Sequence, residues 1–326
     1  MRLRTESEIF GVKGRERSRW AIWLKAIRFH YVPPSFLPAI LCSLIAWSSS
    51  YSPDVAGFLL VLAGVTINHF GLNLLDDVCD YKHAVDGKDL DRNPYTGGSG
   101  VLTEGLLTPR QVAAGAVVCF VLTSLIGLYL TMTRGWPILA FGLFGVFCSV
   151  FYTLPPVRFG YRGLGELGLL INFGPVIGLG AYYVQARTIA LEPLLVSLIL
   201  GVMMWSEIVI NEIPDYEEDR FGGKLNLVAR FGRRNGMLLY VAGLIVAYLV
   251  LVFTVFSRCA PVEVLAGLVS LPLAIKSVIL VKTNYLHKLK MMPANLAMIK
   301  THFLTGAGLI AAYVAYGFHS GLWGGF

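Results

Sequence analysis

The sequence predicts an all-α, polytopic membrane protein, with nine transmembrane helices around a central chamber that opens to the cytoplasmic side. Three observations support this fold class. Of the 326 residues, 56% are hydrophobic and only 14% are charged, whereas soluble domains carry about 25% charged residues. Nine apolar runs are long enough to span a bilayer and lack the alternation of β-strands. Most Lys and Arg residues, finally, fall on one side of these runs.

The expected spans follow one another with Gly, Pro and charged residues mostly between them, as loops require. They cover residues 31–50, 55–78, 110–132, 136–154, 164–186, 190–213, 236–257, 262–281 and 296–318. We interpret residues 31–326 as one nine-helix membrane domain. Residues 1–30 precede it as a basic segment in which no cleavable signal peptide is recognisable.

The basic residues indicate the orientation of the chain. Of the 27 Lys and Arg residues, 22 lie in the N-terminal segment or in the loops after spans 2, 4, 6 and 8, and only 3 lie on the other side. The positive-inside rule places the N-terminus in the cytoplasm and, with nine spans, the C-terminus outside. We therefore expect an integral protein of a prokaryotic cytoplasmic membrane, in contact with membrane lipid. The net charge of +7 is a topology signal and indicates no nucleic-acid partner.

An acidic cluster ends the second span. The stretch NLLDDVCDYKHAVDGKD, from Asn73 to Asp89, contains Asp76, Asp77 and Asp80. Asn73, Asp77 and Asp80 stand at i, i+4 and i+7, so a helix presents them on one face. Carboxylates at a membrane boundary are costly to dehydrate and repel one another, and a positive partner is expected among them.

A second acidic cluster ends the sixth span, on the same side and at the same depth. It is NEIPDYEEDRFGGKLNLVARFG, residues 211–232. Asn211, Asp215 and Asp219 stand at i, i+4 and i+8 and again share a helical face. Each cluster is followed by a Gly-Lys pair, Gly87-Lys88 or Gly223-Lys224. The echo suggests an internal repeat.

The two clusters together indicate magnesium and diphosphate chemistry. Hard carboxylate oxygens suit Mg²⁺, which keeps waters and usually also binds substrate phosphates. Facing clusters would hold two Mg²⁺ ions bridged by one diphosphate. Basic residues nearby in the sequence would neutralise the remaining phosphate charge: Lys82, Lys88, Arg92, Lys224 and Arg230. In an oily chamber, the natural substrate is a diphosphate with a long apolar tail.

With these residues the chain resembles the UbiA superfamily of intramembrane aromatic prenyltransferases over nearly its whole length. DDVCD is similar to the first family motif, N/D-D-x-x-D, and DYEEDRFGGK to the second, D-x-x-x-D with a following Gly-Lys. Two positions depart from the family. Ala84 stands where a further Asp is common, with Asp86 as its candidate substitute, and Phe29 replaces a Pro in the segment that begins at Arg28.

The resemblance assigns roles to these residues. It implies that five carboxylates bind Mg²⁺ and, through it, an isoprenyl diphosphate: Asp76, Asp77, Asp80, Asp215 and Asp219. Asn73 and Asn211 would orient these carboxylates or contact the diphosphate, and Arg28 would bind the substrate. Tyr152 and Arg158 match a loop that covers the site, where the Tyr152 ring would steady an allylic cation. An interfacial tyrosine and a topology charge are the alternative interpretations of these two residues.

His69 and Glu207 each lie one turn before the asparagine of their cluster. We expect both to line the chamber, because an ionisable residue inside a membrane is usually functional. His69 would hydrogen-bond a cluster carboxylate or deprotonate the acceptor. A buried histidine satisfied by its neighbours is the alternative.

The resemblance implies Mg²⁺-dependent transfer of an isoprenyl chain from its diphosphate to an aromatic acceptor, through an allylic cation. Two stretches, FYTLPPVRFGYRGLGELGLLINFGP and YTGGSGVLTEGLLTPRQ, resemble the branch that prenylates 1,4-dihydroxy-2-naphthoate in menaquinone synthesis. The alternative acceptors are 4-hydroxybenzoate, homogentisate, a chlorophyll precursor and a glycerol-phosphate lipid. An ion-coupled transporter is the alternative of a different class, but it would carry its charges near the bilayer midplane rather than at cytoplasmic helix ends.

Overall fold

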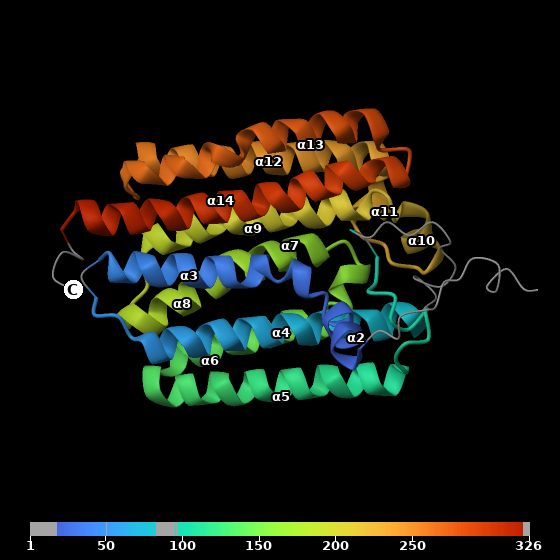
Figure 1. Ribbon diagram of the computed structural model, residues 1–326, viewed down its shortest axis with the longest axis horizontal. Coiled ribbons are helices and arrows are strands. Elements are labelled where there is room, and N and C mark those ends of the chain that lie inside the picture. The colour runs from blue at the N-terminus through green and yellow to red at the C-terminus, as the bar shows by residue number, and fades with distance from the viewer. Residues whose placement is uncertain (1–17, 50, 83–94, 96, 322–326) are drawn as a thin grey trace, which may run out of the picture.

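The computed structural model describes residues 18–49, 51–82, 95 and 97–321, and this part of the chain is helical without any strand (Figure 1). Each expected span lies on a helix or on consecutive helical segments. These are α3 (Pro33–Trp47), α4 (Val55–Lys82), α5 (Pro109–Arg134), α6 (Trp136–Phe151), α7 (Gly165–Ile171) with the π-helical turn η3 (Asn172–Val176) and α8 (Ile177–Ala186), α9 (Leu191–Glu212), α12 (Arg233–Phe256), η4 (Val262–Ser270) with α13 (Leu271–Asn284), and η5 (Leu289–Met291) with α14 (Met292–His319).

Seven of these segments, within the described residues, are long and apolar enough to cross a membrane. The other two, α3 and α6, are apolar but only 15 and 16 residues long. The chain is therefore an integral membrane protein. Its large apolar side chains remain exposed where they would meet lipid, as Val121, Leu125 and Leu128 do on α5, whereas most of α9 is buried inside the bundle.

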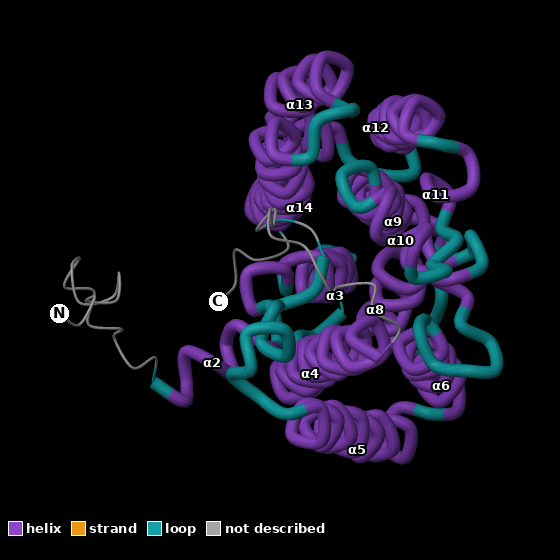
Figure 2. Tube along the Cα trace, turned by 90° about the vertical axis from the view of Figure 1, so that its right-hand side faces the viewer, coloured by secondary structure: helices purple, strands orange, loops and turns teal. Residues whose placement is uncertain are grey.

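Viewed end on, the bundle has two sides (Figure 2). One contains α4, α5 and α6, and the other contains α9, α12, α13 and α14, with α3 and α8 between them. Short helices connect the long ones, namely α2 (Arg19–Ala26), η1 (Phe29–Tyr31), η2 (Phe159–Tyr161), α10 (Tyr216–Phe221) and α11 (Leu227–Phe231). Figure 1 shows α10 and α11 at one end of the bundle.

Local sequence accounts for where individual helices begin. At the start of α5, the Thr108 side chain accepts a hydrogen bond from the Gln111 N–H, and the Gln111 side chain accepts one from the Thr108 N–H. This capping box, with Pro109 at the first helical position, satisfies N–H groups that a helix start leaves unpaired. These contacts therefore fix Thr108 as the residue at which α5 begins.

A close approach of two backbones joins the halves of the bundle. Gly174, in the π-helical turn η3, lies against Gly201 of α9, so that a Cβ added to Gly174 would meet the Gly201 Cα at 2.6 Å. Any side chain at either position would separate the two segments. The π-helical turn also holds Pro175, whose missing N–H disturbs regular helical hydrogen bonding.

Candidate active site

A polar cavity of about 160 Å³ lies between the ends of α4 and α9 that carry the two acidic clusters. Its wall includes, from α4, His69, Asn73, Asp76 and Asp80. From α9 it includes Met204, Glu207, Ile208, Asn211 and Glu212. Connecting segments contribute Arg28, Tyr152, Asp215, Glu218, Asp219, Lys224, Asn226 and Lys288. Both clusters therefore face one cavity, as the sequence predicted.

The first cluster differs from the expected helical face in one residue. The sequence predicts Asp76, Asp77 and Asp80 all as Mg²⁺ ligands, with Asn73, Asp77 and Asp80 on one helical face, but the cavity wall carries Asp76 and Asp80 and not Asp77. On a helix, Asn73, Asp76 and Asp80 stand at i, i+3 and i+7, which is an equally good face. Asp76 Oδ1 is buried and has no hydrogen-bond partner among the described residues.

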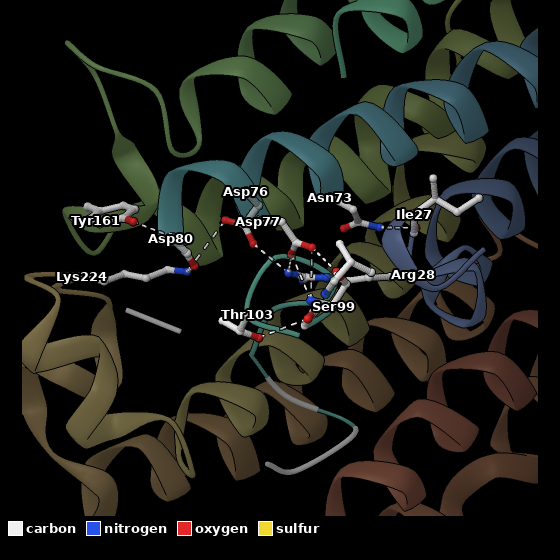
Figure 3. Close-up of polar contacts among 12 residues, drawn as sticks. Ile27, Arg28, Asn73, Asp76, Asp77, Asp80, Ser99, Thr103, Tyr161 and Lys224 are labelled. Atoms are coloured by element: carbon white, nitrogen blue, oxygen red, sulfur yellow. Dashed lines mark hydrogen bonds and ion pairs between the residues drawn. The ribbon is translucent and has the colours of Figure 1, made fainter. Parts of the chain in front are cut away.

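Asp77 lies beside the cavity and holds Arg28 and Ser99 (Figure 3). Its carboxylate accepts hydrogen bonds from the Arg28 guanidinium, from the Ser99 hydroxyl and, at 3.1 Å, from the Ser99 N–H. The same guanidinium nitrogen is 3.5 Å from Asp76 Oδ2. Asp77 thus ties the segment before α3 and the loop before α5 to α4.

Lys224 joins the two clusters. Its backbone N–H donates to the Asp219 carbonyl at 2.7 Å, and its ammonium donates to Asp80 Oδ2 at 2.8 Å (Figure 3). The turn between Asp219 and Lys224 requires Gly223, whose φ of +72° lies in the left-handed region that favours glycine. Through the turn at Gly223, the ammonium group of Lys224 in the second motif therefore lies against the Asp80 carboxylate of the first motif.

The surroundings of the second cluster favour a bound cation. Asp219 is buried and accepts a hydrogen bond from the Asn226 side chain at 2.6 Å, and Lys288 Nζ is 3.9 Å from Asp215 Oδ1. Burial raises the pKa of the Asp219 carboxyl well above its usual value, and Lys224 offsets part of that shift. Burial alone would lower the pKa of Lys224, but the Asp80 and Asp76 carboxylates outweigh it and raise that pKa well above its usual value. Further positive charge would stabilise Asp219 as an anion.

Two tyrosines surround the Lys224 ammonium. The nitrogen lies 5.9 Å from the ring centre of Tyr152 and 5.6 Å from that of Tyr161, and the Tyr161 hydroxyl donates to Asp80. Tyr152 is buried on the cavity wall, as expected. Arg158 is not on this wall, and its guanidinium stacks on the ring of Tyr161, 4.0 Å from the ring centre.

The deeper end of the cavity holds the ionisable residues expected there. His69 is buried, and its Nδ1 is 3.0 Å from the Ser35 hydroxyl. Glu207 is buried opposite on α9, 2.7 Å from Nδ1 of His302 on α14. One turn nearer the clusters, the Asn73 amide donates to the Ile27 carbonyl at 3.0 Å, and Asn211 Oδ1 accepts from Asn295 at 2.9 Å.

Two other predicted phosphate ligands, Lys82 and Arg230, are not on the cavity wall. Lys82 is exposed at the end of α4, and Arg230 donates to the Leu225 carbonyl at 2.7 Å. Lys88 and Arg92 lie outside the described residues, as does Asp86.

Sequence reasoning missed several residues of the site. The sequence places Lys288 only among the basic loop residues that indicate topology, and it predicts no role for Tyr161, Ser99, Asn226 or His302. Tyr161 and Asn226 stand next to recognised stretches, where a search for hydrogen-bond donors would have found them. Lys288 and His302 come from the last helical hairpin, far along the chain from both motifs, and no sequence signal connects them with the cavity.

The residues present fit a divalent cation that shares its coordination with a phosphate ligand. Within the described part of the chain, no three His, Cys, Asp or Glu side chains converge into a closed metal cage. Mg²⁺ is usually bound by one or two carboxylates together with waters and substrate phosphates. The oxygen Oδ1 of Asp76, which accepts no hydrogen bond from the described residues and lies 3.9 Å from Lys224 Nζ, and the buried Asp219 carboxylate are hard ligands of that kind on one cavity.

Comparison with known proteins identifies the family of the chain and its fold. Residues 35–299 match the family model described as the UbiA prenyltransferase family. The chain is 30% identical to the 1,4-dihydroxy-2-naphthoate octaprenyltransferase of Escherichia coli K12, over 67% of this chain and 71% of that relative. Its fold is similar to that of a UbiA homolog from Aeropyrum pernix K1, with a TM-score of 0.65 at 15% identity, over 87% and 98% of the two chains. A UbiA homolog from Archaeoglobus fulgidus, bound to DMAPP and Mg²⁺, gives a TM-score of 0.59 at 16% identity, over 90% and 98%.

Proposed function

The chain belongs to the UbiA prenyltransferase family, and on that premise we propose that it transfers an isoprenyl chain from its diphosphate to 1,4-dihydroxy-2-naphthoate within the membrane. The observation that carries the proposal is the single cavity between the two acidic clusters, with Lys224 between them. The naphthoate acceptor is supported by the relative from Escherichia coli, whose name specifies that acceptor. Prenyl transfer itself is the activity for which the curated relatives are named.

Four carboxylates would hold Mg²⁺ and the diphosphate. Asp76 and Asp80 would do so from α4, and Asp215 and Asp219 from the segment after α9. Bound Mg²⁺, which we expect as two ions, supplies the charge that makes a diphosphate a good leaving group. Asp77 would serve the site by holding Arg28 and Ser99 in place.

The cations of the chain would act on the same diphosphate. Arg28, Lys224 and Lys288 all line the cavity, and each pairs with one of the acidic clusters. As the C1–O bond to the diphosphate breaks, these fixed positive groups stabilise the charge that develops on the leaving oxygen. The ring of Tyr152 would face the allylic cation, and the apolar walls would keep water away from it.

The bundle supports the predicted topology. We propose that α3 and α6, together with their flanking residues, also cross the membrane, which gives nine spans. The cavity lies at the end of the bundle from which the basic loops emerge, since Arg28, Lys224 and Lys288 reach it from those loops. By the positive-inside rule this end, with the N-terminus, faces the cytoplasm of a prokaryotic cell.

An assay of transfer from labelled isoprenyl diphosphate tests the proposal. Purified protein in liposomes is offered dihydroxynaphthoate, 4-hydroxybenzoate, homogentisate or a glycerol-phosphate lipid, with and without Mg²⁺. We expect Mg²⁺-dependent product with dihydroxynaphthoate. Product with another acceptor alone would discard the naphthoate assignment, and product with none, by protein that binds the diphosphate, would contradict transferase function.

A further inference from the structure

Glu207 and His302 form a buried pair at the deep end of the cavity. Glu207 Oε2 lies 2.7 Å from His302 Nδ1, and the two residues are 4% and 2% exposed. Glu207 is on the cavity wall, whereas His302, on α14, is not among the wall residues and lies behind it. The pair therefore presents one carboxylate to the cavity and supports it from outside.

Glu207 lies apart from the end of the cavity where the acidic clusters would bind the diphosphate. On α9 it stands one turn before Asn211, the first residue of the second cluster, and four helical residues span about 6 Å. Met204 and Ile208, which are neighbours of Glu207 on the cavity wall, are apolar. An apolar surface with one carboxylate suits an aromatic ring that carries a hydroxyl group, beyond the carbon from which the diphosphate leaves.

Packing alone does not account for this pair. His302 Nε2 is buried and has no hydrogen-bond partner within the described structure. A buried ionisable pair stabilises a protein only when its remaining polar atoms are hydrogen-bonded. Because His302 Nε2 has no hydrogen bond within the described structure, the Glu207–His302 pair is poorly suited to stabilising the fold. The same two helices also carry an ordinary contact at their other end, where the Tyr313 hydroxyl donates to Glu192 at 2.7 Å.

We propose that Glu207 takes the proton from a phenolic hydroxyl of the acceptor, and that His302 is the positioning residue that holds the carboxylate for this transfer. The inference rests on the proposed function, because it requires a phenolic acceptor. Glu207 is the catalytic residue of the pair, since it alone lines the cavity.

The step balances without a further reactant. The hydroxyl proton passes to Glu207, and the electron pair it leaves moves into the ring. The ring carbon then bonds to C1 of the isoprenyl chain, whose C1–O bond pair departs with the diphosphate. The attacked carbon loses its carboxylate as CO₂, which restores the aromatic ring as a phenolate. Protonated Glu207 returns its proton to that oxygen, so the pair is regenerated.

His69 is fixed in a different way. The Ser35 hydroxyl donates to the Val32 carbonyl at 2.8 Å, so its oxygen accepts the hydrogen bond from His69 Nδ1–H. The ring also packs edge-on against Phe173, with 4.9 Å between ring centres. His69 is thus held in place by Ser35 and Phe173 as a wall residue, and we assign the proton transfer to Glu207.

The test compares acceptors whose hydroxyl groups differ in acidity. Glu207→Gln keeps the shape of the side chain and removes the base. With dihydroxynaphthoate we expect kcat to fall roughly 10²–10⁴-fold, the range for loss of a general base. With halogenated analogues, whose hydroxyls are already ionised, the loss should shrink markedly. Mg²⁺-dependent binding of the isoprenyl diphosphate should not change, which also reports that the variant is folded.

Further variants distinguish the role of Glu207 as the base from the role of His302 as its positioning residue. His302→Gln retains a hydrogen-bond donor and should lose less activity than His302→Leu. Glu192→Gln is the matched control, since it removes a carboxylate from the same helix pair away from the cavity, and it should behave as the wild type. An acidity-dependent loss in His69→Gln, rather than in Glu207→Gln, would overturn the assignment.

The outcomes distinguish this inference from the proposed function. If the wild type prenylates dihydroxynaphthoate and Glu207→Gln loses the same factor with every acceptor, the inference fails while the proposed function stands. The same holds if Glu207→Gln keeps the full rate. If the wild type prenylates no phenolic acceptor, both fail.

Discussion

The Lys224 ammonium donates a 2.8 Å hydrogen bond to Asp80, although the two residues belong to different acidic motifs and are 144 positions apart. Its backbone stays with the second motif through the 2.7 Å bond to the Asp219 carbonyl. The two motifs are therefore parts of one site, and Lys224 is the group that lies between them.

Replacing Lys224 with methionine should lower turnover roughly 10²-fold, as loss of one preorganised donor to a developing charge typically does. The length of the side chain is kept and only the charge is lost. Initial rates of isoprenyl transfer measure the effect. Lys282→Met is the control, because Lys282 is exposed at the end of α13, away from the cavity. An unchanged rate in Lys224→Met would show that its charge plays no part.

Magnesium and the isoprenyl diphosphate should bind cooperatively. In the structure Lys224 and Arg28 already pair with the carboxylates, so an ion alone must compete with them. A diphosphate would draw both cations to its own oxygens and free the carboxylates for the metal. We expect each ligand to tighten the other about 5–150-fold, measured by calorimetry with one ligand titrated at fixed concentrations of the other. Independent binding of the two ligands would contradict this model.

Asp76 and Asp77 should differ when each is changed to asparagine. Asp76→Asn removes a carboxylate from the cavity wall and should raise the Mg²⁺ concentration needed for half-maximal turnover. Asp77→Asn weakens the anchoring of Arg28 and Ser99, and should lower thermal stability and turnover at an unchanged Mg²⁺ requirement. A Mg²⁺ titration of both variants measures the difference. The reverse pattern would return Asp77 to the metal site, as the sequence first suggested.

Gly174→Ala should destabilise the bundle by about 1–3 kcal/mol, the usual cost of overpacking. The new methyl group would lie 2.6 Å from the Gly201 Cα, and this backbone cannot move away without separating α9 from the π-helical turn. Thermal unfolding in detergent measures the effect. Gly127→Ala is the control, since a Cβ on this α5 residue meets nothing within 4 Å. Equal melting temperatures for both variants would argue against a tight contact.

The long helices and the two acidic motifs could be predicted because they depend on local sequence. Apolar runs of about twenty residues usually span a membrane, and the DxxD spacing of the first motif defines a helical face by itself. In the second motif the expected face of Asn211, Asp215 and Asp219 is interrupted, because α9 ends at Glu212 and Asp215 is the N-cap of α10. The choice between Asp76 and Asp77 could not be made this way. Both lie within one helical turn of Asn73, and only the positions of Arg28 and Ser99 decide which carboxylate turns from the cavity.

What the sequence did not predict depends on contacts between distant segments. His302 supports Glu207 from 95 positions away, and Lys288 reaches Glu218 from 70 positions away. Neither residue stands in a motif, because a contact of this kind requires only one donor at the right place. The close approach of Gly174, in the π-helical turn, to Gly201 of α9 likewise joins distant segments, and apolar periodicity does not encode it.

The first measurement is the rate of isoprenyl transfer to dihydroxynaphthoate as a function of Mg²⁺ concentration, for the wild type, Asp76→Asn, Asp215→Asn and the double variant. If both motifs act on one diphosphate, each single variant should lose most of the activity and the double variant should lose little more. Losses that multiply in the double variant, or transfer that continues without Mg²⁺, would contradict a shared metal–diphosphate site.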